Sequence, residues 1–235
     1  MGYLAIIPAR SGSKGLKDKN IKDLNGHPLI YYSIKAAIDS GCFDEIHVST
    51  DSQTYQQIAI NCGANVPFLR NPETSLDTSS TWDTVKECLN KYSNLGKTFD
   101  GFMLLQPTSP LRTAEDIKKA FKIYQEKQAN IVVSVVKEEY SPLQSFMISE
   151  SSEIKDLAKN KYFECRRQDL PDYYKFNGAI YLLNTQYFYN NFNSIYKEGV
   201  YACEMPSNRS IDIDNSFDFF LAEQILKYKK ETPLL

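Results

Sequence analysis

A basic loop containing glycine follows the first apolar run of the chain. The segment reads ARSGSKGLKDKN, from Ala9 to Asn20, and comes directly after the run Leu4–Ile7. Four positive charges fall within ten residues, at Arg10, Lys14, Lys17 and Lys19. Because glycine lets a backbone approach a ligand closely and turn its N–H groups inward, this pattern after a strand favours polyphosphate binding. The loop contains neither GxxxxGK[ST] nor GxGxxG, and a solvated basic loop is the alternative interpretation.

Two aspartates near the C-terminus could form a metal site. They belong to the segment SIDIDN, Ser210–Asn215. In an extended segment alternate residues point to one face, so Asp212 and Asp214 would converge while the two isoleucines face the core. Adjacent carboxylates repel unless a cation lies between them, and Mg²⁺ is typically held by few protein carboxylates plus phosphate oxygens. We therefore expect Mg²⁺, or Mn²⁺ in its place, at this pair; an acidic capping pair is the alternative.

Two other segments offer groups that bind hydroxyls and acids. The turn LLQPTSPLR, Leu104–Arg112, is stiffened by two prolines and presents Gln106, Thr108 and Ser109, which suit ribose or sugar hydroxyls. The segment CRRQDLP, Cys165–Pro171, carries adjacent arginines that could clamp a carboxylate or a phosphate. The alternatives are a plain strand-to-helix turn and surface arginines.

The composition excludes several classes of protein. The chain has 235 residues and a formal net charge of −2, which argues against a general nucleic-acid binder. It has no apolar run of about 18 residues and no signal-peptide pattern at its N-terminus, so we expect no membrane partner. Its five cysteines are scattered and it has only two histidines, so a zinc site is not expected. Reduced thiols indicate a cytoplasmic protein.

Apolar patterns alternate between strands and helices along most of the chain. Strands are predicted at Leu4–Ile7, Glu45–Thr50, Val66–Leu69, Phe102–Leu105, Ile131–Val136, Ala179–Leu183 and Tyr201–Glu204. Helices are predicted between Pro28 and Gly41, over Tyr55–Cys62 and Thr81–Lys91, after Thr113, and near the C-terminus. This alternation predicts an α/β fold with a mostly parallel sheet and helices on both faces.

Residues 1–235 are predicted to form a single domain with one insertion. Residues 137–172 break the alternation and are charged, serine-rich and marked by prolines, with a hairpin expected around Phe146–Ile154. In parallel sheets ligands bind beyond the carboxyl ends of the strands. We therefore expect Arg10, Arg70 and the turn after Leu105 to lie at one edge of the sheet.

Four motifs in this order, IIPARSGSKGLKDKN, LLQPTSPLR, FNGAIY and SIDID, resemble those of the CMP-sialic acid synthetases, also called acylneuraminate cytidylyltransferases. The similarity runs along nearly the whole chain. It implies a Rossmann-like nucleotidyltransferase fold. The implied reaction joins CTP and a nonulosonic acid such as N-acetylneuraminate, giving the CMP-sugar and pyrophosphate, with attack of the anomeric hydroxyl on the α-phosphate.

The same resemblance implies roles for residues at the matching motif positions. It implies catalytic roles for Arg10, Lys19, Asp212 and Asp214, with the two aspartates as metal ligands. Nucleotide binding is implied for Ala9, Arg10, Ser13, Lys14, Gly15, Lys19, Asn20, Arg70, Ser79, Ser80 and Thr81. Sugar binding is implied for Gln106, Arg167 and Tyr181, and the hydroxyls of Thr108 and Ser109 in the same turn are expected to take part in it. The insertion resembles the family's dimerisation segment, so a homodimer is expected in which a partner lends basic residues to the sugar pocket.

Two departures from the family pattern affect the acid pocket. Gln144 stands where the family often has a lysine that contacts the sugar carboxylate, and Lys175 stands where an arginine often precedes NGAIY. Neuraminic, legionaminic, pseudaminic and deaminated nonulosonic acids therefore remain open as substrates. A Kdo or methylerythritol cytidylyltransferase and an inactive nucleotide-binding regulator are further alternatives. SIDID with NGAIY, and the presence of both aspartates with the loop cations, argue against them.

Overall fold

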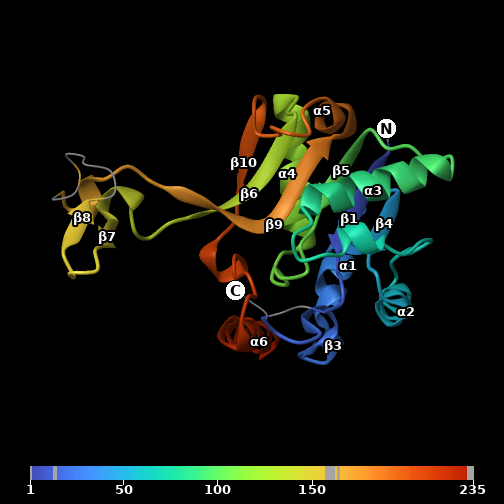
Figure 1. The fold of residues 1–235 in the computed structure, drawn as a ribbon, viewed down its shortest axis with the longest axis horizontal. Coiled ribbons are helices and arrows are strands. Elements are labelled where there is room, and N and C mark those ends of the chain that lie inside the picture. The colour runs from blue at the N-terminus through green and yellow to red at the C-terminus, as the bar shows by residue number, and fades with distance from the viewer. Residues whose placement is uncertain (1, 13–14, 157–161, 163–164, 232–235) are drawn as a thin grey trace.

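A six-stranded sheet runs through the centre of the protein, in the order β10-β6-β9-β5-β1-β4 (Figure 1). The structure is a computed structural model that describes residues 2–12, 15–156, 162 and 165–231. The strands of the sheet are β1 (Tyr3–Pro8), β4 (Glu45–Ser49), β5 (Gly101–Leu104), β6 (Ile131–Lys137), β9 (Tyr174–Asn184) and β10 (Val200–Glu204). β9 is antiparallel to both of its neighbours, and the other pairs in the sheet are parallel. The predicted α/β fold with a mostly parallel sheet is confirmed.

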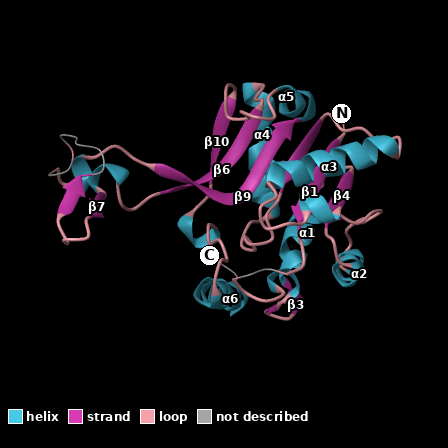
Figure 2. Cartoon of the chain, viewed as in Figure 1, coloured by secondary structure: helices cyan, strands magenta, loops and turns pink. Residues whose placement is uncertain are grey.

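Helices cover both faces of this sheet (Figure 2). One face carries α1 (Leu29–Ser40), α2 (Gln53–Asn61) and α4 (Ala114–Lys127), and the other carries α3 (Thr81–Asn94) and α5 (Thr185–Asn190). In β1, Leu4 and Ile6 pack toward α3 and α5, whereas Ala5 and Ile7 pack toward the opposite layer. All four side chains are fully buried. Such a strand is apolar without interruption because both of its faces are covered.

The ends of several helices follow local sequence signals. The helix predicted after Thr113 is α4, and Thr113 caps it in a capping box with Asp116. Gly41 ends α1 with φ of 64°. The last helix, α6 (Ser216–Glu231), packs against a small separate cluster around the fully buried Ile213. Short elements complete the body: β2 (Asp23–Leu24), β3 (His27–Pro28), and 3₁₀ turns η1 (Lys19–Ile21), η2 (Pro72–Thr74) and η5 (Ser207–Arg209). No helix in the described part of the chain combines the length and apolarity needed to span a bilayer.

Between β6 and β9 the chain leaves the sheet and forms an arm, residues 138–173. The described part of the arm contains η3 (Pro142–Gln144), β7 (Phe146–Ile148), β8 (Ile154–Asp156) and η4 (Arg167–Asp169). β7 and β8 pair in antiparallel fashion, so the expected hairpin is present. Figure 1 shows the arm standing away from the body, joined to it by the extended ends of β6 and β9.

Two predicted strands differ from those observed. Val66–Leu69 is not a strand: a single parallel bridge joins Asn65 to His47. Pro67 explains the difference, because proline has no N–H to continue a ladder. β9 begins at Tyr174, well before the expected start, and passes through Gly178 with φ of 76°.

Candidate active site

A cavity of about 490 Å³ opens beyond the carboxyl ends of β1 and β5. It brings together most of the motifs that the sequence analysis identified. Its lining includes Arg10, Gly15, Lys19, Asn20, Arg70, Ser79, Thr81, Gln106, Thr108 and Asp214. These residues come from segments far apart in the chain, and the expected grouping of Arg10, Arg70 and the turn after Leu105 at one edge of the sheet is confirmed.

The basic loop places two cations at this cavity. The Arg10 guanidinium lies 2.5 Å from the Asp77 carboxylate, and the Lys19 ammonium donates to the Ile213 carbonyl at 2.5 Å. Asn20 is buried and its side-chain amide donates to the Arg10 carbonyl at 3.1 Å, which fixes the loop next to β1. The cations therefore face the cavity with partners that a polyanion could replace.

A third cation, Arg70, is almost completely buried at the same cavity. Its Nε donates to the Ser49 hydroxyl at 3.0 Å and its Nη2 to the Ser49 carbonyl at 2.6 Å, which attaches it to the end of β4. Burial lowers the pKa of the Arg70 guanidinium, and the like charge of Arg10 adds to this effect. A bound anion would relieve both effects, so this part of the cavity suits phosphate.

The N-terminal turn of α3 adds hydroxyl groups. Ser79, Thr81 and Thr84 line the cavity, and Thr84 is buried within it. Ser80 is instead the N-cap of α3, and its hydroxyl accepts from the Trp82 backbone N–H at 3.1 Å. Ser80 thus shapes the helix start that presents its neighbours.

The two aspartates of SIDID lie beside Lys19. The Lys19 ammonium is 3.9 Å from the Asp214 carboxylate. Burial raises the pKa of Asp212, and the like charge of Asp214 raises it further. A hydrogen bond from the Thr108 side chain and the charge of Lys19 oppose these effects. The segment is not a strand, so the expected strand-like alternation holds only in part: Ile213 is fully buried, and Ile211 is half-buried.

The donor set at this pair fits a hard divalent cation. Among the described residues no group of three or more carboxylate, histidine or cysteine side chains could hold a metal. A two-carboxylate site suits Mg²⁺ that completes its shell with phosphate and water oxygens. The mutual repulsion that raises the Asp212 pKa is the effect a bound cation would remove.

The turn Leu104–Arg112 directs only some of its polar side chains into the cavity. Gln106 and Thr108 line the cavity, whereas Ser109 is fully buried, with no hydrogen-bond partner for its hydroxyl among the described residues. The buried Arg112 lies beneath the turn and donates to the Ala179 carbonyl at 2.9 Å and the Ser33 hydroxyl at 2.5 Å. Arg112 therefore supports the turn, and the Ser109 hydroxyl does not line the cavity as the sequence predicted.

Several residues proposed for the site do not line this cavity. Ala9 is fully buried at the end of β1. Tyr181, on β9, packs against Trp82 with ring centroids 5.9 Å apart; its pKa is raised by burial and by nearby Asp212. Arg167 lies in η4 of the arm. The Arg167 side chain, Ser13 and Lys14 lie outside the described residues.

The two departures from the family pattern both have partners within the chain. The Gln144 side-chain amide donates to the Cys165 carbonyl at 2.6 Å, inside the arm. Lys175, at the start of β9, forms an ion pair of 2.6 Å with Glu138. Neither residue lines the cavity of its own chain.

Thr74, Leu76 and Thr84 also line the cavity, although they belong to none of the predicted site motifs. Thr84 could have been found, because it lies one helical turn after Thr81 on the same face. Thr74 and Leu76 lie in an irregular loop whose position depends on distant contacts, including a hydrogen bond from the Thr74 hydroxyl to Glu87. No local pattern marks them.

The fold and cavity are those of a nucleotidyltransferase, and comparison with known proteins identifies the family. The chain belongs to the cytidylyltransferase family, whose profile matches residues 4–229. Among solved structures, CMP:2-keto-3-deoxy-manno-octonic acid synthetase complexed with CTP aligns with a TM-score of 0.72 at 16% identity, covering 97% of this chain and 100% of that one. The 4-diphosphocytidyl-2C-methyl-D-erythritol synthase of Anaerococcus prevotii aligns with a TM-score of 0.67 at 13% identity, covering 96% and 98%. At these identities the similarity shows the fold alone.

Curated relatives are more similar in sequence. The N-acylneuraminate cytidylyltransferase of Streptococcus agalactiae serotype V is 40% identical over 93% of this chain, and the chain spans about half (52%) of its length. The CMP-N,N'-diacetyllegionaminic acid synthase of Legionella pneumophila is 38% identical over 98% of this chain and 99% of its own. A pseudaminic acid cytidylyltransferase of Campylobacter jejuni is 32% identical over 99% of both chains. These similarities confirm the resemblance found from the motifs.

Proposed function

We propose that this protein transfers CMP from CTP to the anomeric hydroxyl of a sialic acid, N-acetylneuraminate or a related nonulosonic acid, and releases pyrophosphate. One observation carries the proposal: a single cavity unites Arg10, Lys19 and Arg70 with the carboxylate of Asp214. A triphosphate needs the cations, and the carboxylates provide the ligands for the metal that accompanies it.

In this mechanism the chain positions the reactants and stabilises negative charge. Arg10, Lys19 and Asn20 hold the triphosphate, with the backbone around Gly15 completing the loop. Arg70 and the hydroxyls of Ser79 and Thr81 bind the cytidine end. As the anomeric oxygen bonds to the α-phosphorus and its proton passes to water, the bond from the α-phosphorus to the bridging oxygen of the β-phosphate breaks. Pyrophosphate then leaves with negative charge that the loop cations neutralise.

Asp212 and Asp214 would hold Mg²⁺ in this site, with Mn²⁺ as a substitute. Such an ion would neutralise phosphate charge and would lower the pKa of a hydroxyl bound to it. Thr108 keeps Asp212 oriented through its hydrogen bond. Gln106 at the cavity wall, with Tyr181 beside Asp212, would contact the sugar acid.

The second candidate substrate is a legionaminic acid. The synthase from Legionella pneumophila matches this chain over nearly its full length on both sides. Gln144 and Lys175, where the family pattern differs, are the positions at which the acid pocket would change. The shared fold with the two solved synthases does not favour Kdo or methylerythritol, because it leaves the sugar site undetermined.

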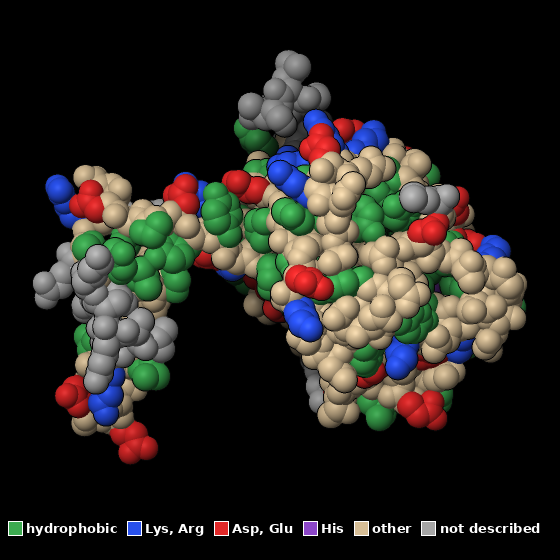
Figure 3. Space-filling model, turned by 90° about the horizontal axis from the view of Figure 1, so that it is seen from above, with side chains coloured by type: hydrophobic (Ala, Val, Ile, Leu, Met, Phe, Trp, Pro, Cys, Tyr) green, Lys and Arg blue, Asp and Glu red, His purple; other side chains and the backbone are tan. Residues whose placement is uncertain are grey.

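We further propose that the protein works as a homodimer joined through the arm. Large apolar side chains on its hairpin are exposed: Phe146 by 47%, Met147 by 54% and Ile148 by 68%. Figure 3 shows hydrophobic side chains gathered on the projecting arm. A second copy of the chain would bury them and could bring Arg167 to the neighbouring cavity. Sedimentation of a variant lacking residues 140–170 tests this, since a dimer that persists would contradict it. The free thiols of Cys42, Cys62, Cys88 and Cys203 support a cytoplasmic location.

The experiment that tests the proposed reaction is pyrophosphate release with Mg²⁺ and N-acetylneuraminic acid, run separately with CTP, GTP and UTP. Release with CTP alone supports the proposal. If no nucleotide supports release, the panel is repeated with legionaminic and pseudaminic acids. If no pyrophosphate is released with any of these acids, the proposal of an active cytidylyltransferase is refuted and an inactive nucleotide-binding protein is favoured.

A further inference from the structure

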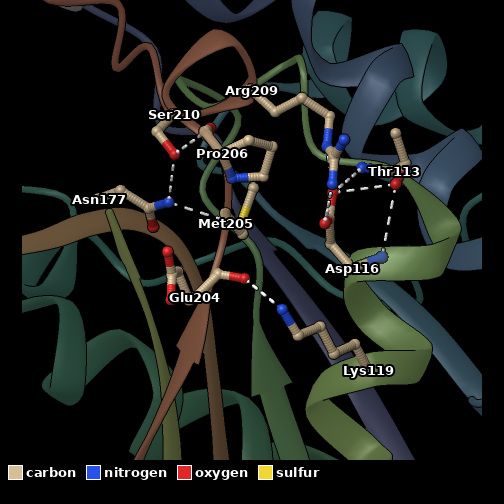
Figure 4. Close-up of polar contacts among 9 residues, drawn as sticks. All are labelled: Thr113, Asp116, Lys119, Asn177, Glu204, Met205, Pro206, Arg209 and Ser210. Carbon is tan, nitrogen blue, oxygen red and sulfur yellow. Dashed lines mark hydrogen bonds and ion pairs between the residues drawn. The ribbon is translucent and has the colours of Figure 1, made fainter. Parts of the chain in front are cut away.

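An ion pair outside the cavity fixes the segment that leads to the two aspartates. Arg209, the last residue of η5, donates from Nε to Asp116 Oδ2 at 3.0 Å and from Nη2 to Asp116 Oδ1 at 2.7 Å (Figure 4). Asp116 is only 2% exposed, and its Oδ2 also accepts from the Thr113 N–H at 3.0 Å and hydroxyl at 2.9 Å. Arg209 is therefore bound to the first turn of α4 by a two-pronged charged contact.

A second contact holds the residue that follows. The buried Asn177, on β9, donates from its side-chain amide to the Ser210 hydroxyl at 2.9 Å, and this hydroxyl donates to the Pro206 carbonyl at 2.9 Å (Figure 4). The Asn177 side-chain oxygen accepts from Ser134 at 2.5 Å. Residues 206–210 are thus tied to α4, β9 and β6.

The next fixed point comes three residues later. The Ile213 backbone N–H donates to the Thr108 carbonyl at 2.8 Å, and the Ile213 side chain is fully buried. Only Ile211 and Asp212 lie between this point and Ser210. Adjacent Cα atoms are about 3.8 Å apart, so a segment this short has little freedom when both of its ends are held. The position of the Asp212 carboxylate therefore depends on the contacts upstream of it.

We propose that Arg209 is a positioning residue for the two-carboxylate site and acts through Asp116. Without the charged contact, η5 can move relative to α4, and Asp212 loses its fixed distance from Asp214 and from the Thr108 turn. The result is weaker binding of a divalent cation. This inference rests on the proposed function in one respect, namely that Asp212 and Asp214 bind the cation.

The test measures Mn²⁺ binding directly, by electron paramagnetic resonance of free Mn²⁺ during titration of the full chain with CTP present. Contacts around metal ligands typically change metal affinity about 10- to 100-fold. We expect Arg209→Met to raise the Mn²⁺ dissociation constant about 10-fold, with the affinity for CTP measured without metal unchanged. The Mg²⁺ concentration needed for half-maximal pyrophosphate release should rise in parallel.

Lys119→Met is the matched control. Lys119 lies in α4, like Asp116, and donates to the Glu204 carbonyl at 2.6 Å (Figure 4). Its substitution therefore removes one positive charge and one hydrogen bond between α4 and the end of β10. Because the Lys119–Glu204 hydrogen bond lies farther along the chain from Asp212 and Asp214, the Mn²⁺ affinity of Lys119→Met should stay within about twofold of the wild type. If Arg209→Met unfolds, Asp116→Asn and Arg209→Lys replace it: each weakens the same contact, and each should weaken Mn²⁺ binding.

Asp212→Asn separates failure of this inference from failure of the proposed function. Wild-type Mn²⁺ affinity in Arg209→Met or its replacements, together with loss of Mn²⁺ binding in Asp212→Asn, would refute the positioning role and leave the metal site in place. An equal loss of Mn²⁺ affinity in Lys119→Met would also refute the positioning role of Arg209, since loss of any contact between α4 and this segment would then explain the effect. Unchanged Mn²⁺ binding in Asp212→Asn would refute both the metal site at Asp212 and Asp214 and the positioning role of Arg209.

Discussion

Because of the buried His47, we expect the free energy of unfolding to fall when the pH is lowered from 7 to 5. It is fully buried on β4, and its Nδ1 lies 3.2 Å from the Asn65 carbonyl. Burial, reinforced by the nearby positive charges of Arg70 and Lys91, lowers the pKa of His47 from 6.5 to about 3. Over this pH range the imidazole is neutral in the folded protein and becomes charged only when the chain unfolds.

The magnitude follows from the two pKa values. Below pH 6.5 the unfolded state binds a proton that the folded state does not, so stability falls as the pH falls. Each pH unit below the unfolded pKa of 6.5 lowers the free energy of unfolding by about 1.4 kcal/mol, which gives a loss of about 2 kcal/mol at pH 5. The buried Asp116 and the half-buried Asp51 and Glu87 have lowered pKa values, so their carboxylates lose their stabilising effect only at lower pH, around and below 4.

Urea unfolding at pH 7, 6 and 5, followed by the fluorescence of the single tryptophan, measures this loss at constant protein concentration. Trp82 lies in α3, inside the folded body. His47→Gln is the matched variant, because glutamine can still donate to Asn65 but does not titrate. It should show less stability at pH 7 and a flatter profile down to pH 5. Equal wild-type stability at pH 7 and pH 5, or the same slope in His47→Gln, would refute the reasoning.

Three substitutions test the site. Asp212→Ala should abolish pyrophosphate release without changing the far-ultraviolet circular dichroism spectrum, because it removes one carboxylate of the proposed metal pair and leaves the buried Ile213 in place; normal kcat would contradict that assignment. Lys19→Ala should weaken CTP binding more than sugar binding in calorimetric titration, and an unchanged CTP affinity would exclude the phosphate role. Gly178→Ala should destabilise the fold by about 1–2 kcal/mol in urea unfolding, because φ is 76° there, and should lower kcat, because the new Cβ would lie 3.4 Å from the Asp212 carboxylate; wild-type behaviour in both assays would contradict this.

Sequence patterns located the site because its motifs follow strands. The apolar run Leu4–Ile7 is buried on both faces, and this pattern is readable from the residues alone. Once such strands are recognised as parallel, geometry places their carboxyl ends at one edge. This is why Arg10, Gln106 and Arg70 could be assigned to a shared cavity, and the structure places them together there.

The direction of β9 and the path of residues 65–70 could not be obtained in this way. β9 has an apolar core like that of β6, and only its pairing shows that it runs antiparallel. The segment around Pro67 is apolar enough to suggest a strand, yet it is joined to β4 by a single bridge at Asn65. Pairing depends on which distant groups meet, and apolar periodicity reports only on burial.

The sequence by itself determined the α/β class, the main elements and the chemistry of the motifs, since periodicity, caps and charged groups are local properties. The tertiary structure alone decided that Ser109 is buried and does not line the cavity, that Arg10 forms an ion pair with Asp77, and that Arg209 forms one with Asp116. The two contacts join residues 67 and 93 positions apart, and the burial of Ser109 depends on the layers packed around it. Such pairings follow from the packing of the whole chain, which no short stretch of residues encodes.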